Sequence, residues 1–299
     1  MDEFIARNPQ FIKRGTNTVG LLGRKYVFSK TVVIPTGLQV EIDAGAVLEM
    51  GPNVSFLSYS PIHAEGTENL HIIIRPIDSN KPWGTFAVLN TEQKKSIIKY
   101  VEFYSGSGDI INGVKFSGMA AFHNADVDVS NSKFSNAFDD DGLNVKYGNF
   151  VIEDSLFENN FSDGIDIDFG PKNAIIRNNT FVNNGYGGGG DSVDLSWSDI
   201  IVEGNEINGC TDKGISVGEK SNPIIKNNTI QHCDIGIVVK DLSVAQIDNN
   251  LIEDVRVGVA AYQKKAVFGG GKARVSNLTF NNATIDFEQD DLSEIIIAD

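Results

Sequence analysis

The chain has 299 residues and a formal net charge of −15, from 40 acidic and 25 basic residues. This acidic balance argues against nucleic acid as a partner and against binding to an anionic membrane surface. Thirty glycines and only three methionines, with abundant Asn and Asp, are typical of short strands joined by many turns, so we expect an all-β protein.

Residues 1–29 precede the first regular strand pattern and predict an N-terminal cap, because an uncapped stack of strands exposes a sheet edge. Residues 30–299 predict one single domain. No apolar stretch reaches the length of a transmembrane segment. The start, Met1 to Arg7, lacks the basic residues and apolar run of a secretory signal. Because both ends are abrupt, we expect an excised domain of an extracellular or cell-surface protein.

A repeat of about 22 residues runs through the chain. Glycine or a substitute, followed by alternating apolar residues, recurs at Met119, Gly142, Gly164, Ser192, Gly214, Gly236 and Gly258. A unit of this size cannot bury its apolar face alone, whereas stacked units form a continuous core with parallel strands in register. The repeat therefore predicts a right-handed parallel β-helix, a solenoid whose coils each hold about three short strands.

Two further columns follow from this register. The polar residues Ser132, Ser155, Asn179, Asn205, Asn228 and Asn250 end the second strand of successive coils and predict a hydrogen-bonded ladder. Cys210 and Cys233 occupy nearly equivalent points of adjacent coils. A disulfide is geometrically conceivable there, but we expect two buried, stacked thiols.

Charge gathers in the middle coils. The residue before the coil start is Asp141, Asp163, Asp191 and Lys213 in turn, and the third position of the strand brings Asn144, Asp166 and Asp194 to the outer face. Like charges stacked in register destabilise neighbouring strands. A divalent cation, a shared proton with a raised pKa, or ion pairs with Lys213 and Lys146 must offset them. This pattern predicts a functional site.

One coil is longer than the others. Gly185 to Gly190 add a glycine-rich loop directly before Asp191, which either walls a cleft or is a tolerated surface insertion. Trp197 either stacks on a sugar ring or fills the core.

Residues 160–241 resemble the polygalacturonase branch of the pectate-lyase-like superfamily. Ser162-Asp163-Gly164-Ile165-Asp166 matches that family's first motif, Gly189-Gly190-Asp191 the second, Asp212-Lys213-Gly214 the third and Val238-Val239-Lys240 the fourth. Asp163, Asp191 and Lys240 fit the motif positions. Gly190, Lys213 and Val238 depart from it, where the family has an acid, a histidine and an arginine.

A carboxylate cluster beside a lysine is also similar to the β-elimination lyases of the superfamily. In those enzymes acidic residues hold Ca²⁺ and a lysine or arginine removes a proton. Aspartates around Lys213 raise its pKa, so it acts as a base only where a cation neutralises them. Other runs, such as Lys213 to Glu219, resemble β-helix modules found beside spore-coat-H-type proteins, which favours a non-enzymatic role.

The resulting hypothesis is an enzyme that cleaves a polysaccharide by lyase or glycoside hydrolase chemistry; the alternative is a non-catalytic glycan-binding or structural surface module. The candidate catalytic residues are Asp163, Asp191, Asp194 and Lys213. The candidate Ca²⁺ ligands are Asp163, Asp166, Asp191 and Asp194. The candidate substrate-binding residues are Asp141, Asn144, Lys146, Asp168, Trp197, Glu219 and Lys240.

Overall fold

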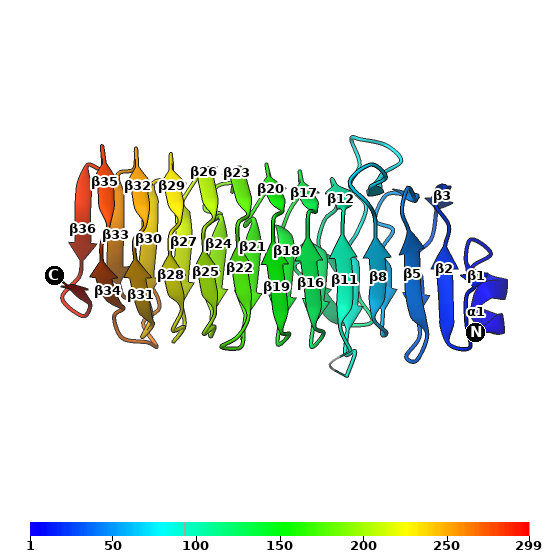
Figure 1. The fold of residues 1–299 in the computed structure, drawn as a ribbon. Coiled ribbons are helices and arrows are strands. Elements are labelled where there is room, and N and C mark those ends of the chain that lie inside the picture. Colours follow the sequence, from blue (N-terminus) through cyan, green and yellow to red (C-terminus); the bar gives the residue numbers. More distant parts are fainter. Residues whose placement is uncertain (93, 299) are drawn as a thin grey trace. The chain divides into compact units, whose positions relative to one another are not determined.

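The computed structural model describes residues 1–92 and 94–298. These residues fall into two compact units, with the boundary between Phe150 and Val151. The single domain expected over residues 30–299 stays a prediction. A stack of coils has no common centre, because each coil contacts only its neighbours. Both units repeat the same coil of three short strands (Figure 1).

The N-terminal unit begins with α1 (Asp2–Arg7) and then forms three sheets. The first contains β1 (Ile12–Lys13), β2 (Thr18–Leu21), β5 (Gln39–Asp43), β8 (Ile62–Glu65), β11 (Ser96–Lys99) and β16 (Val127–Ser130). The second contains β3 (Lys25–Phe28), β6 (Val47–Met50), β9 (Ile72–Pro76), β12 (Val101–Tyr104) and β17 (Lys133–Ser135). The third contains β4 (Val32–Ile34), β7 (Phe56–Ser58), β10 (Phe86–Leu89), β15 (Gly118–His123) and β18 (Asp141–Lys146), and β13 (Asp109–Ile111) pairs with β14 (Val114–Phe116) in a hairpin.

The N-terminal cap is shorter than the predicted residues 1–29. On α1, Phe4 packs edge-on against Phe11, with ring centroids 5.1 Å apart. The first coil already begins at Thr18, because β2 pairs in parallel with β5 and β3 pairs in parallel with β6. The alternation of buried and exposed residues in β3 is a strand pattern of its own, which the prediction assigned to the cap.

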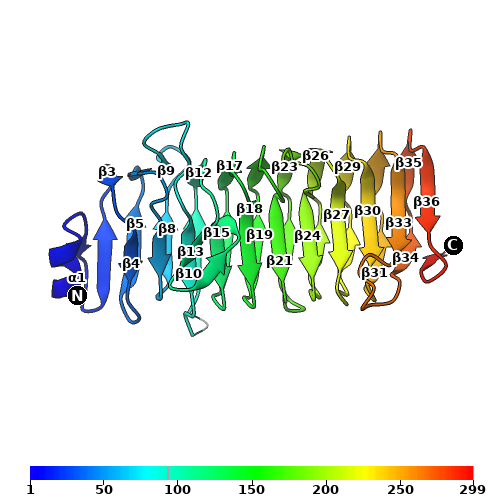
Figure 2. The same cartoon turned by 180° about the vertical axis from the view of Figure 1, so that it is seen from behind.

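The C-terminal unit repeats the three-sheet arrangement with parallel strands. Its first sheet contains β19 (Phe150–Glu153), β22 (Ile175–Arg177), β25 (Ile201–Glu203), β28 (Ile224–Lys226), β31 (Val244–Asp248), β34 (Lys272–Ser276) and β37 (Glu294–Ile297). Its second contains β20 (Leu156–Glu158), β23 (Thr180–Asn184), β26 (Glu206–Cys210), β29 (Thr229–Gln231), β32 (Leu251–Glu253) and β35 (Thr279–Asn281). Its third, here called the site sheet, contains β21 (Ile165–Asp168), β24 (Val193–Ser196), β27 (Lys213–Gly218), β30 (Ile235–Lys240), β33 (Val257–Tyr262) and β36 (Ile285–Gln289) (Figure 2).

The predicted Asn ladder is present in the C-terminal unit. The backbone N–H of Asn179 donates to Asn205 Oδ1, that of Asn205 to Asn228 Oδ1 and that of Asn228 to Asn250 Oδ1, each at 2.9 Å. All four side chains are buried. The ladder satisfies backbone groups at the turn that water cannot reach, so it fixes the register of the coils.

Cys210 and Cys233 form a disulfide, so the expectation of two stacked thiols is wrong. In-register stacking places their Cα atoms 4.8 Å apart, within the range that a disulfide spans. The bond joins the end of β26 to the residues after β29 on the next coil. Among the described residues, no helix is long and apolar enough to span a membrane.

Candidate functional site

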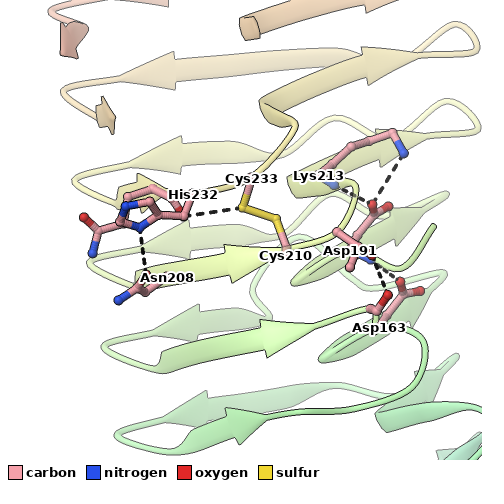
Figure 3. The surroundings of a disulfide bond; sticks show 10 residues. Asp163, Asp191, Asn208, Cys210, Lys213, His232 and Cys233 are labelled. Carbon is pink, nitrogen blue, oxygen red and sulfur yellow. Dashed lines mark hydrogen bonds and ion pairs between the residues drawn. A yellow bond between two sulfur atoms is a disulfide. The ribbon is translucent and has the colours of Figure 1, made fainter. Parts of the chain in front are cut away.

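The site lies where the strands of the site sheet begin. Parallel pairing sets Asp166 on β21 opposite Asp194 on β24, and Asp194 opposite Ser216 on β27. In the turns just before β21 and β24, the backbone N–H of Asp191 donates to Asp163 Oδ1 at 2.6 Å (Figure 3). The coil register alone therefore brings carboxylates from successive coils together, as the sequence predicts.

Asp191 lies near one negative charge, that of Asp194, and two positive charges, those of Lys213 and Lys240. Its side chain accepts hydrogen bonds on Oδ1 from the Lys213 backbone N–H at 3.0 Å and from Lys213 Nζ at 3.4 Å (Figure 3). The residue is only 5% exposed. Burial, reinforced by the negative charge of Asp194, raises the pKa of Asp191 to about 6, although Lys213 and Lys240 oppose this rise. Asp191 therefore carries a proton for part of the time in mildly acidic solution.

Lys213 is a buried ammonium with two carboxylate partners. Its Nζ pairs with Asp191 and also contacts the Asp212 carboxylate. Burial disfavours the charge, but Asp191 and Asp212 outweigh it and raise the pKa of Lys213 above its usual value. The direction agrees with the sequence prediction. In this arrangement Lys213 is a fixed positive charge rather than a base.

Three carboxylates have the geometry of a cation site. Asp163, Asp166 and Asp194 each place one oxygen within 4.8 Å of the others. Two oxygens bound to one Ca²⁺ at 2.3–2.6 Å are at most about 5 Å apart, so these residues fit that ion. Asp194 Oδ1 is buried and has no hydrogen-bond partner among the described residues. Asp191, the fourth predicted ligand, lies outside this group and faces Lys213.

Lys240 supplies a second buried positive charge. Its Nζ donates to Ser216 Oγ at 2.7 Å and lies 3.8 Å from Asp194 Oδ1. Beyond it the outer face is apolar, since Val238 packs in a buried cluster with the half-buried Tyr262 beside it. Burial raises the pKa of the Tyr262 hydroxyl, against the opposing effect of Lys213 and Lys240. The charged patch thus has a sharp apolar edge.

The predicted substrate-binding residues at the other end of the strands differ in exposure. Trp197 is 40% exposed, so it does not fill the core. Its ring lies parallel to Phe169 at 5.9 Å and meets Phe268 edge-on at 6.1 Å. Glu219 is buried and accepts a hydrogen bond from Ser196 Oγ at 2.5 Å, and it pairs with Lys265. Asp168 is half-buried on β21.

Three predicted residues belong to β18 of the N-terminal unit. Asp141 and Asn144 are buried, and Lys146 is half-buried. Asn144 Oδ1 is hydrogen-bonded to His123 Nε2 at 2.7 Å, and the His123 ring stacks on Phe116 of the β13–β14 hairpin. The amide oxygen of Asn144 is therefore bound to a protein partner, and the residue is buried.

Asp212 and Tyr262 were not among the predicted site residues. Asp212 precedes Lys213 in the sequence. Whether two such neighbours pair depends on their side-chain conformations, which the sequence pattern does not give. Tyr262 occupies the same strand position as Lys240, opposite it in register. Extending the column of Lys240 by one coil toward the C-terminus reaches the tyrosine.

Comparison with known proteins places this geometry in a family. Residues 33–189 and 112–285 match the family model described as a right handed beta helix region. The chain belongs to the right-handed β-helix family. A comparison with curated proteins found no match.

Solved structures share this right-handed β-helix fold at low sequence identity. An exopolygalacturonase from Thermotoga maritima superposes with a TM-score of 0.60 and 8% identity, covering 94% of this chain and 84% of that one. A double mutant of a periplasmic alginate epimerase gives a TM-score of 0.59 and 11% identity, covering 100% and 83%. The Dettilon tailspike protein gives 0.54 and 14%, covering 93% and 62%. At these identities the likeness concerns the fold alone.

Proposed function

We propose that the C-terminal unit of this β-helix protein cleaves a polysaccharide, with Asp191 as the proton donor. The observation that carries the proposal is the buried pair of Asp191 and Lys213 beside the carboxylates of Asp163, Asp166 and Asp194. General acid catalysis needs a carboxyl group that keeps its proton near neutral pH, next to carboxylates that stay ionised. The raised pKa of Asp191 supports this assignment.

Each charged residue of the site has its own role in the hydrolysis. Asp191 gives its proton to the glycosidic oxygen as the bond to the anomeric carbon breaks. Water attacks the anomeric carbon and forms the new C–O bond, while a carboxylate of the neighbouring group takes the proton that the water loses. The negative charges stabilise the positive charge that develops on the sugar. Lys213 remains protonated and holds the Asp191 carboxylate once its proton has left. Lys240 neutralises Asp194 and offers a positive charge to an acidic sugar.

A cation-dependent lyase is the second candidate, and the geometry of Asp163, Asp166 and Asp194 favours it. A Ca²⁺ ion bound there supplies positive charge to a uronate carboxylate. With these aspartates neutralised, Lys213 loses part of the field that keeps it protonated. The two chemistries leave different products, since elimination creates an unsaturated sugar and hydrolysis does not.

The test is product formation from alginate, polygalacturonate and neutral glucans. Wild-type protein is expected to release reducing ends from at least one of them, and Asp191→Asn is expected to lose about a hundredfold in rate, the usual contribution of a general acid. Asp199→Asn, an exposed carboxylate outside the cluster, is the matched control. Ultraviolet absorbance of the products separates elimination from hydrolysis. Glycan binding without any product would favour the non-catalytic module.

A further inference from the structure

The loop from Gly185 to Gly190 is held in place by hydrogen bonds to neighbouring coils. The backbone N–H of Gly185 donates to Asn160 O and that of Gly187 to Phe161 O, both at 2.9 Å. Thr211 Oγ1 also bonds the Gly185 carbonyl. The loop is therefore attached to the coil on either side of it, and it does not have the freedom of a lid.

The backbone conformation of this loop requires glycine at several positions. Gly185, Gly188 and Gly189 have φ values of +83°, +94° and +85°, a region that other residues rarely adopt. A Cβ on Gly187 would lie 2.5 Å from the Phe161 ring. The backbone thus passes directly over an aromatic ring, which only glycine permits.

The loop presents a single side chain, that of Tyr186, because the other five residues are glycine. Tyr186 is 53% exposed. Its ring meets the Phe161 ring edge to face, with centroids 5.4 Å apart and an interplanar angle of 86°. Such a contact orients an aromatic ring. A six-residue excursion therefore serves to hold one tyrosine ring in place at the surface.

The segments that carry this aromatic pair continue directly into the acidic cluster of Asp163, Asp166, Asp191 and Asp194. Phe161 lies two residues before Asp163, and the loop of Tyr186 runs directly into Asp191. The hydrogen bond between the Asp191 backbone N–H and Asp163 joins the two segments. We consider a ligand that contacts both the rings and the carboxylates. It must combine an apolar face, for the tyrosine, with polar groups, for the carboxylates and lysines, and a sugar ring has both.

We propose that Tyr186, braced by Phe161, is the sugar-stacking residue of a subsite beside the acidic cluster. The inference rests on the proposed action on a polysaccharide and adds a specific contact to it. Stacking depends on the ring and not on the hydroxyl group, so a phenylalanine can replace the tyrosine. The braced ring positions one sugar so that the adjoining glycosidic bond lies at Asp191.

The test measures binding of alginate and polygalacturonate by affinity electrophoresis in the Asp191→Asn background, so that no polymer is consumed. Tyr186→Ala is expected to weaken binding about tenfold, since the aromatic contact with the sugar is lost. Tyr186→Phe is expected to bind within about twofold of the parent. Val267→Ala removes apolar surface that is 85% exposed on another loop and should leave binding unchanged. Urea unfolding of each variant checks that the fold is intact.

Different outcomes separate this subsite from the proposed function. If Tyr186→Ala binds both polymers as the parent does, or if neither polymer binds at all, the subsite is wrong. An equal loss in Tyr186→Phe and Tyr186→Ala also overturns it, because the hydroxyl and not the ring would then carry the contact. If binding depends on the ring while wild-type protein makes no product, the subsite stands and the catalytic proposal falls.

Discussion

The side chain of Asp191 accepts hydrogen bonds from both the backbone N–H and the Nζ of Lys213, at 3.0 and 3.4 Å, and both residues are almost fully buried. Such a pair is costly to separate, because either charge alone is left in a poorly solvated place. The stability of the folded protein and the protonation of Asp191 therefore both depend on this pair.

Lys213→Met should destabilise the protein by about 3 kcal/mol at pH 8, where Asp191 would remain as a buried charge without its main partner. At pH 5 the loss should be smaller, since Asp191 can take up a proton. Urea unfolding measures both values. The double variant Asp191→Asn/Lys213→Met should lose less than the sum of the single variants; strict additivity would show that the pair is not coupled.

The pH dependence of stability follows from the raised pKa of Asp191, about 6 against an ordinary value of 3.8. Because the folded state retains the proton more firmly, this contribution to stability is complete below pH 3.8 and is lost as the pH rises through 6. Between pH 4 and 8, in the presence of a chelator, wild-type protein should lose about 2–3 kcal/mol relative to Asp191→Asn. Parallel pH profiles of the two proteins would contradict the assignment.

Ca²⁺ binding tests the second candidate chemistry. Isothermal titration of metal-free protein with CaCl₂ should show a site that Asp194→Asn weakens at least tenfold, since a carboxylate ligand is lost. Asp199→Asn is the control and should bind as wild type does. Absence of binding in wild-type protein would remove the cation-dependent lyase from consideration and leave the acid–base site intact.

The Asn ladder should be a main source of stability in the C-terminal unit. Asn205 accepts from the Asn179 backbone N–H and donates to the Ile176 carbonyl oxygen at 3.1 Å, and both groups are buried. Asn205→Ala leaves them without partners, which costs about 3 kcal/mol in urea unfolding. Asn208→Ala, on the exposed side of β26, should cost less than about 0.5 kcal/mol.

The disulfide closes a sequence separation of 23 residues. Replacing both cysteines by serine should lower the free energy of unfolding by about 3 kcal/mol, largely through the freedom regained by the unfolded chain. A reducing agent should lower the urea midpoint of wild-type protein and leave that of the double serine variant unchanged. Equal midpoints for all samples would show that the crosslink adds nothing.

The fold was predictable because β-helix coils repeat. Spacing of Gly142, Gly164 and Gly214 sets the register, and the register alone places Asp166 opposite Asp194. The cap boundary was not predictable in the same way, since Thr31 stands in the first coil where a later coil has Gly142. For Cys210 and Cys233 the register gave the proximity, but whether two close thiols join depends on side-chain directions and oxidation.

Side-chain pairing was the part of the site that the sequence left open. The column of carboxylates follows from the repeat, yet it does not say that Asp191 turns to Lys213 while Asp163, Asp166 and Asp194 face one another. The burial of Asn144 depends on a hairpin that interrupts the repeat between β12 and β15. The role proposed for Tyr186 was not predictable from the repeat either, because Tyr186 lies in an insertion that has no equivalent position in other coils.

Dependence on the leaving group tests the role of Asp191 most directly. The rates of wild-type protein and Asp191→Asn are compared on the polysaccharide that wild-type protein cleaves and on the 4-nitrophenyl glycoside of its sugar, whose leaving group departs without a proton. If Asp191 is the proton donor, the variant should lose about a hundredfold or more in rate on the polysaccharide and much less on the aryl glycoside. An equal loss on both substrates, or no loss on the polysaccharide, would contradict the assignment of Asp191 as the proton donor.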